Sequence, residues 1–332
     1  MDIASSLSLA TSNFVSVPVL VFILGVLSVR LKADLRLPDP VYQAISIYLL
    51  LAIGLKGGVA LRESSASEVL VPIAVAIVLG VSIPLLAFGI LTAITKLNGV
   101  DRGAMAAHYG STSLVTFTAA LVFLDSANVS YEGFMPTLLT VLEIPGIIVG
   151  LLLAYRYSNK REASGSEKSK DWLSEVFFGK SVLLLFGGLV IGFFTGTKGY
   201  EQVQPFFGAL FTGVLALFLL EMGVLAGRRL ADVRKAGAGL IVFAIFFPLI
   251  AGTIGIISGY LAGLSLGGAM ILGVLCASAS YIAAPAAVRL ALPEANPGIT
   301  LTASLGITFP VNLIIGIPLY YFIAQVLEGW FV

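Results

Sequence analysis

The chain has 332 residues, of which 58% are hydrophobic and only 11% are charged, with 19 basic and 18 acidic side chains. A soluble domain carries about 25% charged residues, so this composition indicates a membrane protein. The apolar runs are continuous and about 20 residues long, which favours membrane helices over a β-barrel. The single cysteine, Cys276, excludes an intrachain disulfide, and the single histidine, His108, argues against a histidine metal site.

The apolar runs predict ten membrane helices, so the expected fold class is an all-α membrane protein. One clearly polar segment, residues 158–178, separates the fifth helix from the sixth. Its lysines, acidic residues and serines indicate a solvated linker. The predicted helices span roughly residues 16–32, 41–61, 69–95, 103–124, 133–157, 180–198, 205–226, 236–263, 267–291 and 297–326.

The basic residues are distributed unevenly between the two ends of these helices. If the N-terminus lies outside, all of the 19 basic residues except Lys56, Arg62 and Lys198 fall in inside loops or at inside helix ends. Cytoplasmic loops of membrane proteins carry an excess of lysine and arginine. The distribution therefore predicts that both termini lie outside and that the linker 158–178 is cytoplasmic.

The two halves of the sequence resemble each other, and each contains five predicted helices. Because five is an odd number, the halves must be inverted relative to each other in the membrane. Such an inverted repeat, with interrupted helices at matching positions, is typical of secondary transporters whose substrate site lies near the midplane. We expect a first repeat at 1–157 and a second at 179–332. The matched residues are Thr137 with Thr302, Pro145 with Pro310, Tyr155 with Tyr320 and, at nearly the same shift, Pro84 with Pro248.

Two stretches of small and hydroxyl residues lie where the fourth and ninth helices would cross the bilayer centre. They are expected to interrupt both helices, and the freed backbone groups must face protein, water or a bound solute. The N-terminus of each second half-helix would carry a partial positive charge, and hydroxyls there would bind a small oxyanion without a basic side chain. Packing of small residues is the alternative. The candidate substrate-binding residues are Gly110, Ser111, Thr112, Ser113, Ala277, Ser278, Ala279, Ser280 and Tyr281.

Glu143 is predicted near mid-membrane in the fifth helix, two positions before Pro145. A carboxylate at that depth is costly, which favours a functional role. It could bind Na⁺ together with nearby oxygens, or relay a proton; hydrogen bonding to neighbouring hydroxyls for packing alone is the third possibility. The matching region of the second half offers neutral oxygen ligands that suit Na⁺. The candidate Na⁺ ligands are Glu143, Thr116, Thr308 and Asn312.

The remaining polar residues predicted within helices have simpler interpretations. Lys56 and Glu221 lie near helix ends, where their side chains would extend to the membrane interface. His108 is expected to be a structural, hydrogen-bonded histidine. The sequence contains no nucleotide-binding loop, nucleophile-and-base arrangement or metal-ligand spacing, so we expect neither an enzyme nor ATP-driven transport.

Three of these motifs together resemble a known family. They are His108–Ser113 with Thr116 and Phe117, Glu143–Gly146, and Ala277–Pro285. Over essentially its whole length, the sequence resembles the SbtA-type sodium-dependent bicarbonate transporters of cyanobacteria. The resemblance implies a Na⁺-coupled HCO₃⁻ symporter of the cytoplasmic (inner) membrane that works in inorganic-carbon concentration. Na⁺ would be the coupling ion, and no other cofactor is expected.

The resemblance also implies an assembly and a mechanism. The protein would be a homotrimer in which a core domain, helices 3–5 and 8–10, moves like an elevator against a gate domain, helices 1–2 and 6–7. The fold would be similar to that of the bile-acid sodium symporters. A trimeric PII-like regulatory protein that binds adenine nucleotides would dock on the cytoplasmic face, here near residues 156–170 and 228–235.

Two other functions are compatible with the same pattern. A Na⁺ symporter for a larger organic anion would share the fold but would need an open apolar crevice, which the glycine, alanine and serine residues around the two stretches disfavour. A membrane sensor would recruit a cytoplasmic partner without moving any solute. The paired polar stretches and the family resemblance favour bicarbonate transport over both.

Overall fold

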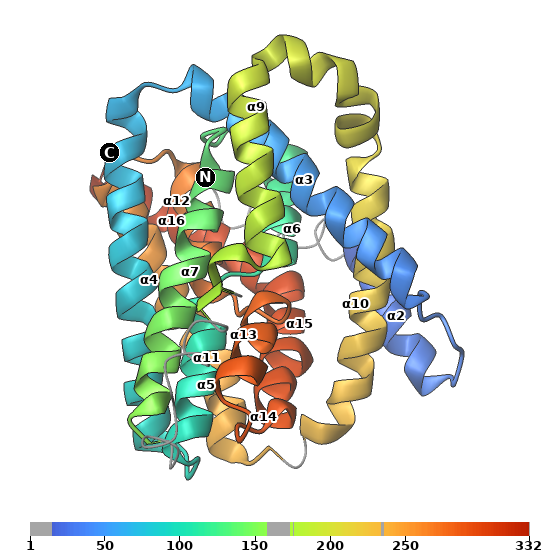
Figure 1. Cartoon of the computed structure of the whole chain (residues 1–332), viewed down its shortest axis with the longest axis vertical. Helices are drawn as coiled ribbons and strands as arrows, with labels where there is room; N and C mark the ends of the chain where they lie inside the picture. Colours follow the sequence, from blue (N-terminus) through green and yellow to red (C-terminus); the bar gives the residue numbers. More distant parts are fainter. Residues whose placement is uncertain (1–14, 158–172, 175, 234–235, 332) are drawn as a thin grey trace.

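The computed structural model describes residues 15–157, 173–174, 176–233 and 236–331. In these ranges the chain is helical and contains no strand (Figure 1). Among the described residues, eight helical stretches are long and apolar enough to span a membrane, judged by length and composition, when Gly99–Ser126, Lys180–Ala209 and Pro297–Phe331, each made of adjoining segments, are counted as one stretch each. The expected all-α membrane class is therefore confirmed. The predicted linker at 158–178 and the predicted docking surface around 156–170 lie mostly outside the described residues.

Each predicted helix except the last overlaps one helical segment or one pair of segments in the structure, and the last overlaps five consecutive segments. The fourth and ninth predicted helices are each broken into two, and the last is one long rod that contains two wider π-helical stretches. The segments are α2 (Val17–Arg30), α3 (Asp39–Glu63), α4 (Ala66–Ile94), α5 (Gly99–Gly110), α6 (Leu114–Ser126), α7 (Met135–Tyr155), α9 (Lys180–Gln204), a π-helical turn (Pro205–Ala209), α10 (Phe211–Val233), α11 (Ala238–Leu261), α12 (Leu266–Ala277), α13 (Ala283–Ala291), α14 (Pro297–Leu301), a first π-helical stretch (Thr302–Thr308), α15 (Phe309–Val311), a second (Asn312–Gly316) and α16 (Ile317–Phe331).

Small residues bring α5 and α7 into backbone contact along their length. Gly103 faces Ala154 near one end of the pair, and Gly110 faces Gly146 at the other. A Cβ atom on Gly146 would lie 1.8 Å from the carbonyl oxygen of Gly110, so no other residue fits there without movement. Close approach through glycine and alanine is typical of helices that pack within a membrane. The contact holds Glu143, on α7, beside the end of α5.

Glycines also pair the helices at the other side of the molecule, where α3 packs on α9 and α2 on α10 (Figure 1). A Cβ atom on Gly54 of α3 would lie 2.9 Å from the Cα atom of Gly188 on α9. In the same way, a Cβ atom on Gly25 of α2 would lie 3.0 Å from the Cα atom of Gly223 on α10. These two helix pairs therefore meet through backbone rather than through long side chains.

Helix α9 bends sharply at Gly196, whose φ of 62° is a left-handed conformation that favours glycine. The end of α3 holds this bend. The guanidinium of Arg62 donates a hydrogen bond to the carbonyl oxygen of Phe194, at 3.1 Å. The hydroxyl of Thr197 donates to the carboxylate of Glu63, at 2.6 Å. The carbonyl oxygen of Phe194, which an unbroken helix would pair internally, thus receives a side-chain partner at the bend.

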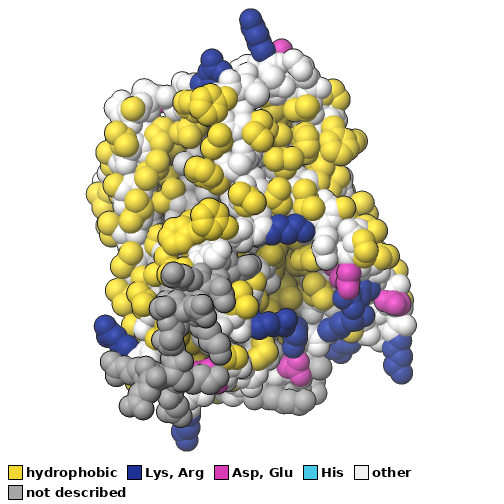
Figure 2. All heavy atoms as spheres, viewed as in Figure 1, with side chains coloured by type: hydrophobic (Ala, Val, Ile, Leu, Met, Phe, Trp, Pro, Cys, Tyr) yellow, Lys and Arg dark blue, Asp and Glu magenta, His cyan; other side chains and the backbone are white. Residues whose placement is uncertain are grey.

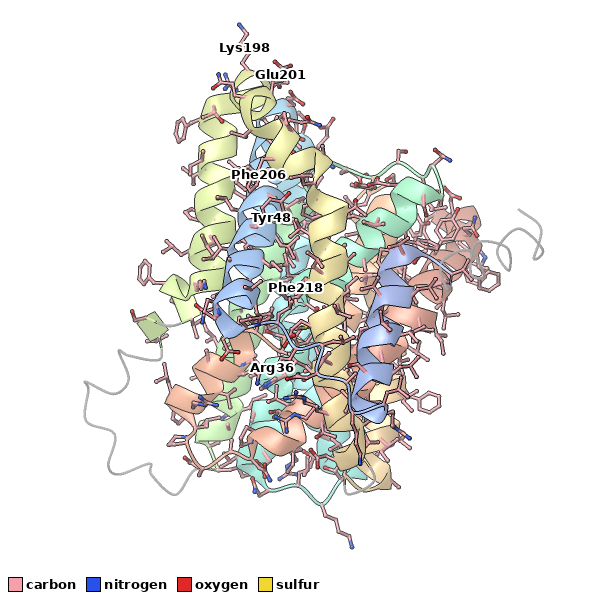
Figure 3. All side chains as sticks on the ribbon, turned by 90° about the vertical axis from the view of Figure 1, so that its right-hand side faces the viewer. Arg36, Tyr48, Lys198, Glu201, Phe206 and Phe218 are labelled. Carbon is pink, nitrogen blue, oxygen red and sulfur yellow. The ribbon has the colours of Figure 1, made fainter. Side chains whose placement is uncertain are left out.

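Beyond the bend the chain folds back toward α10. Tyr48 of α3 donates a hydrogen bond to the carbonyl oxygen of Phe206, and the two rings meet edge to face with centroids 5.0 Å apart. In Figure 3 this contact lies below the tip of the molecule, where Lys198 and Glu201 project away from the helices. The contacts attach the return segment to α3 and so fix the position of α9, whose first turn faces the candidate site described below.

Glu221 has a different role from the one predicted. Its side chain is 3% exposed, and its carboxylate accepts a hydrogen bond from the backbone N–H of Leu37 at 2.7 Å. Arg36 approaches the same carboxylate at 3.8 Å. The predicted extension of Glu221 to the membrane interface is therefore wrong, because the carboxylate instead holds the loop between α2 and α3 against α10. Lys56, the other residue in that prediction, is exposed.

The contact between α5 and α7 predicts the effect of one added methyl group. The substitution Gly146→Ala forces these helices apart and should lower the free energy of unfolding by about 1–3 kcal/mol. Gly89→Ala is the control, because no atom lies within 4 Å of the added Cβ atom. Thermal unfolding in detergent, followed by size-exclusion chromatography, measures both. Equal melting temperatures for the two variants would contradict the close contact.

Candidate functional site

The sequence breaks α5 from α6 at three consecutive hydroxyl residues. Ser111 and Ser113 have extended backbone conformations, with ψ of 170° and 112°. Ser113 then restarts the helix, since its side-chain oxygen accepts a hydrogen bond from the N–H of Thr116 at 3.2 Å. Hydroxyl residues favour this cap position, because their oxygen replaces the missing backbone acceptor. The break therefore leaves an ordered α6 N-terminus inside the protein.

The second break separates α12 from α13 at residues 278–282. Ser278 leaves the helical conformation, with ψ of 165°, and its hydroxyl donates to the carbonyl oxygen of Leu275 at 2.8 Å. Ser280 supplies the restart, because its side-chain oxygen accepts a hydrogen bond from the N–H of Ala284 at 3.1 Å. Serine thus occurs at the end of the first half-helix and before the start of the second in both breaks, although Ile282, the residue directly before α13, provides no side-chain cap.

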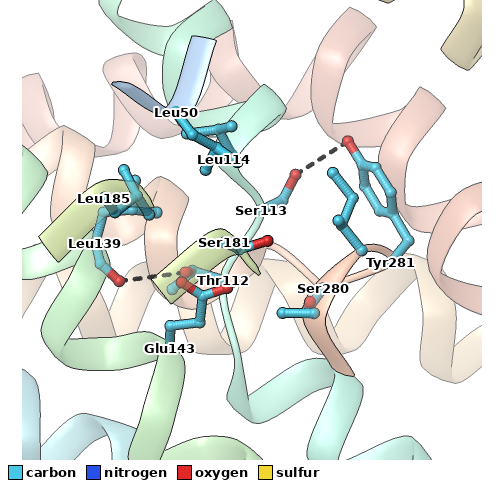
Figure 4. A pocket seen from close by; sticks show the side chains of 12 residues that line it. Leu50, Thr112, Ser113, Leu114, Leu139, Glu143, Ser181, Leu185, Ser280 and Tyr281 are labelled. Carbon is cyan, nitrogen blue, oxygen red and sulfur yellow. Dashed lines mark hydrogen bonds between the residues drawn. The ribbon is translucent and has the colours of Figure 1, made fainter. Parts of the chain in front are cut away.

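The two breaks meet and satisfy each other's backbone groups. The N–H of Ser113 donates to the side-chain oxygen of Ser278 at 2.9 Å. The N–H of Ser280 donates to the carbonyl oxygen of His108 at 2.8 Å. The hydroxyl of Ser113 donates to that of Tyr281 at 3.1 Å (Figure 4). Unpaired backbone groups are costly away from water, so these contacts explain how two irregular segments can lie side by side in the interior.

A narrow cavity of about 20 Å³ lies against the two breaks. Figure 4 shows hydroxyl side chains from both breaks around it, with Glu143 of α7 beside Thr112. Leucines close the rest of the wall. The lining residues are Leu50, Thr112, Ser113, Leu114, Leu139, Glu143, Ser181, Leu185, Ser280, Tyr281, Ile282 and Ala283. Among the described residues, the cavity wall thus combines neutral hydroxyl side chains with one carboxylate and no basic side chain.

The structure divides the predicted substrate residues into two groups. Four of them line this cavity, namely Thr112, Ser113, Ser280 and Tyr281. The others are Gly110, Ser111, Ala277, Ser278 and Ala279, which are buried beside it without lining it.

Two residues of the second group contribute to the site in different ways, one by close packing and one by a hydroxyl without a partner. A Cβ atom on Gly110 would lie 2.7 Å from Pro84 and 3.0 Å from the Cα atom of Gly146, so Gly110 provides the close approach of α5 to α4 and α7. Ser111 is 1% exposed, yet its hydroxyl has no hydrogen-bond partner among the described residues. A buried hydroxyl of this kind is a place where a solute or water would gain a hydrogen bond.

Glu143 is 5% exposed, and its Oε2 atom has no hydrogen-bond partner in the described part of the chain. The packing alternative, in which neighbouring hydroxyls satisfy this carboxylate, is therefore not realised at that oxygen. In Figure 4 the side chain of Glu143 lies beside that of Thr112, and Ser181 lines the same cavity. A buried carboxylate without a partner is strongly unfavourable, so this position suits a cation or a proton.

The other predicted Na⁺ ligands do not line the cavity, and each already has a partner. The hydroxyl of Thr116 donates to the side-chain oxygen of Ser113 at 3.0 Å. The hydroxyl of Thr308 donates to the carbonyl oxygen of Ala244 at 2.6 Å, and it contacts the Tyr109 hydroxyl at 2.7 Å.

Asn312 is likewise engaged. Its amide donates to the carbonyl oxygen of Ala277, the last residue of α12, at 2.8 Å, and it accepts from the Tyr320 hydroxyl at 3.0 Å. His108 is fully buried, with Nδ1 2.8 Å from the carbonyl oxygen of Ala104, as expected for a structural histidine.

Sequence reasoning missed the wall that α3 and α9 contribute. Leu50 of α3 and Leu185 and Ser181 of α9 face the two breaks across the cavity. Nothing distinguishes these leucines from others in apolar helices. Ser181 offered a weak signal, because it is a hydroxyl residue directly before residues 182–194, which carry no polar side chain.

The sequence matches one known family. The model of the Na⁺-dependent bicarbonate transporter superfamily matches residues 18–325, so the chain belongs to this superfamily and the resemblance seen in its motifs is confirmed. Among curated proteins, none matches the sequence. Membership makes the chain a transport protein rather than an enzyme, and it supports Na⁺-dependent bicarbonate transport by a multi-pass membrane protein.

The two buried glutamates should respond in opposite ways to loss of charge. Glu143→Gln removes a buried charge whose Oε2 lacks a partner, and it should raise the free energy of unfolding by about 1–3 kcal/mol in Na⁺-free buffer. Glu221→Gln weakens a charge-assisted hydrogen bond to Leu37 and should lower it by about 1 kcal/mol. Thermal unfolding measures both variants. Destabilisation by Glu143→Gln would mean that this carboxylate is satisfied in the folded protein.

Proposed function

We propose that the protein is a symporter that imports HCO₃⁻ together with Na⁺. The observation that carries this proposal is the cavity between the two breaks, which presents neutral donors and one unpartnered carboxylate. Thr112, Ser113 and Ser280 would donate to the oxygens of a small planar anion, helped by the N-termini of the half-helices that begin there. Thr112 and Ser113 would do so by exchanging their present hydrogen bonds to the Leu139 carbonyl oxygen and the Tyr281 hydroxyl. Ser111, Ser278 and Tyr281 would complete the polar surroundings, and Gly110, Ala277 and Ala279 would keep them close-packed.

The carboxylate gives a physical reason for coupling. An anion about 5 Å from an ionised Glu143 is repelled by about 3 kcal/mol at an effective dielectric constant of about 20. Na⁺ bound at Glu143 would remove this repulsion, so the anion binds well only when the cation is present. Thr116, Thr308 and Asn312 would join such a Na⁺ site by exchanging their present hydrogen bonds. A proton on Glu143 would have the same electrostatic effect, which the Na⁺ dependence of the superfamily disfavours.

We propose further that the two halves, 1–157 and 179–332, are inverted five-helix repeats. Ser113 and Ser278, which meet at the breaks, are 165 positions apart. The sequence match between the halves has the same shift. Two ties between the halves have the same form: Glu132 accepts from the N–H of Ser265 at 2.6 Å, and Asp101 accepts from the N–H of Asn296 at 2.8 Å. In each, a carboxylate of one half holds a loop residue of the other.

The helix packing supports a division into two moving parts. The core domain would comprise α4–α7 and α11–α16, which contain both breaks, and the gate domain would comprise α2, α3, α9 and α10. Core would move like an elevator against gate and carry the site across the cytoplasmic membrane. The cavity wall combines α6, α7 and α13 with α3 and α9, as expected for a site at the boundary between such domains.

The orientation and the assembly belong to the same proposal. Both termini would lie outside, and most Lys and Arg side chains on the face in Figure 2 gather in its lower part, below a broad hydrophobic band. That basic end would face the cytoplasm and receive a PII-like regulatory protein. The protein would act as a homotrimer in the concentration of inorganic carbon.

Uptake of labelled bicarbonate into proteoliposomes tests the coupling. We expect the initial rate to fall at least about tenfold when choline replaces Na⁺, because the anion then meets an uncompensated carboxylate. Glu143→Gln should lose this Na⁺ dependence, whereas the exposed Glu68→Gln should keep it. Equal uptake with and without Na⁺ in the unmodified protein would reject symport, and binding of a partner without any flux would favour a sensor.

A threonine pair tests the anion site. Thr112→Val removes a hydroxyl that lines the cavity, and the loss of one hydrogen bond to a charged solute should raise the KM for bicarbonate about tenfold. Thr118→Val is the matched control, because that buried hydroxyl donates to the carbonyl oxygen of Leu114 and lies outside the cavity wall. Competition by larger organic acids in the same assay would instead indicate a wider substrate range.

A further inference from the structure

A second cavity adjoins the one between the breaks. Its volume is about 220 Å³, compared with about 20 Å³ for the first. Leu50, Ser181, Ile282 and Ala283 line both cavities, so the two share a wall made by α3, α9 and the start of α13. A solute that left the first cavity past these residues would enter the second. The larger cavity is therefore a candidate path between the site and one membrane face.

The two cavities carry opposite charges. Glu143 is the one acidic or basic residue on the described wall of the first cavity, and Lys180 is the one on the described wall of the second. Lys180 begins α9 and is exposed, and no ion pair joins it to another described residue. Its ammonium group is a compact charge on a flexible chain of four carbons, so it can follow a solute within the cavity.

The two charges would drive an anion from the first cavity toward the second once Na⁺ has left. While Na⁺ compensates Glu143, the anion is held by the hydroxyls between the breaks. Once Na⁺ has left, Glu143 repels the anion and Lys180 attracts it across the shared wall. The attraction acts through a water-accessible space, so it should weaken as ionic strength rises, with a screening length of about 8 Å at physiological salt.

We propose that Lys180 binds the transported anion directly. Its ammonium group forms a transient binding site, here called the station, for a small oxyanion between the inner site and the membrane face onto which the second cavity opens. The station rests on the proposed function, because it takes the transported solute to be bicarbonate. It adds a residue outside the two breaks, on the helix that faces them, and it concerns entry and exit rather than coupling.

The test compares lysine variants in inside-out and right-side-out membrane vesicles that contain the full chain. Lys180→Gln and Lys180→Met remove the charge, and Lys180→Arg keeps it. Lys198→Gln is the matched control, since it removes one exposed charge at the other end of the same helix (Figure 3). The readout is Na⁺-dependent flux of labelled bicarbonate against its concentration, at low and at high ionic strength.

We expect both neutral variants to raise the half-saturating bicarbonate concentration about three- to tenfold at low ionic strength, in one vesicle orientation only. The difference should shrink at high ionic strength, and Lys180→Arg should stay within about twofold of the unmodified protein. Values for Lys180→Gln and Lys180→Met that equal those of Lys198→Gln would overturn the station. Equal flux with and without Na⁺ in the unmodified protein would contradict the proposed symport instead.

Discussion

The structure depends on how broken helices satisfy their backbone groups where water is scarce. Each break exposes N–H and C=O groups that a continuous helix would pair internally. Here the breaks solve the problem jointly, through the bonds from Ser113 to Ser278 and from Ser280 to His108. Neither half-helix pair could be ordered in this way without the other. The same mutual dependence places the hydroxyls of both segments around one cavity.

In the proposed function, the cavity would select solutes through the absence of a basic side chain from its described wall. A basic side chain would hold an anion tightly whatever else was bound, whereas hydroxyls and helix ends hold it weakly and reversibly. The carboxylate of Glu143 would add an electrostatic penalty for the anion, which a bound cation would remove. Weak donors together with a conditional penalty are the physical requirements of a carrier, which must release its solute as readily as it binds it.

The sequence predicted the helical segments and both breaks, because long apolar runs and the hydroxyl clusters within them are local properties of the chain. It did not predict which way the hydroxyls point. Ser111 and Thr112 are neighbours in the sequence, but only Thr112 lines the cavity, since the helical period is lost within the break. Contacts between distant helices were equally hidden: the tie from Glu221 to Leu37 and the place of Ser181 depend on tertiary packing alone.

The contact between Gly110 and Gly146 has a mechanical consequence. Long side chains between helices can change rotamer and so accommodate small shifts, but a backbone-to-backbone contact cannot adjust in this way. The segment with Thr112 and the segment with Glu143 are therefore stiffly joined, so the spacing between them stays nearly constant when the surrounding helices shift. Any displacement of this part of the molecule would therefore move the proposed anion and Na⁺ sites together, with little change in the distance between them.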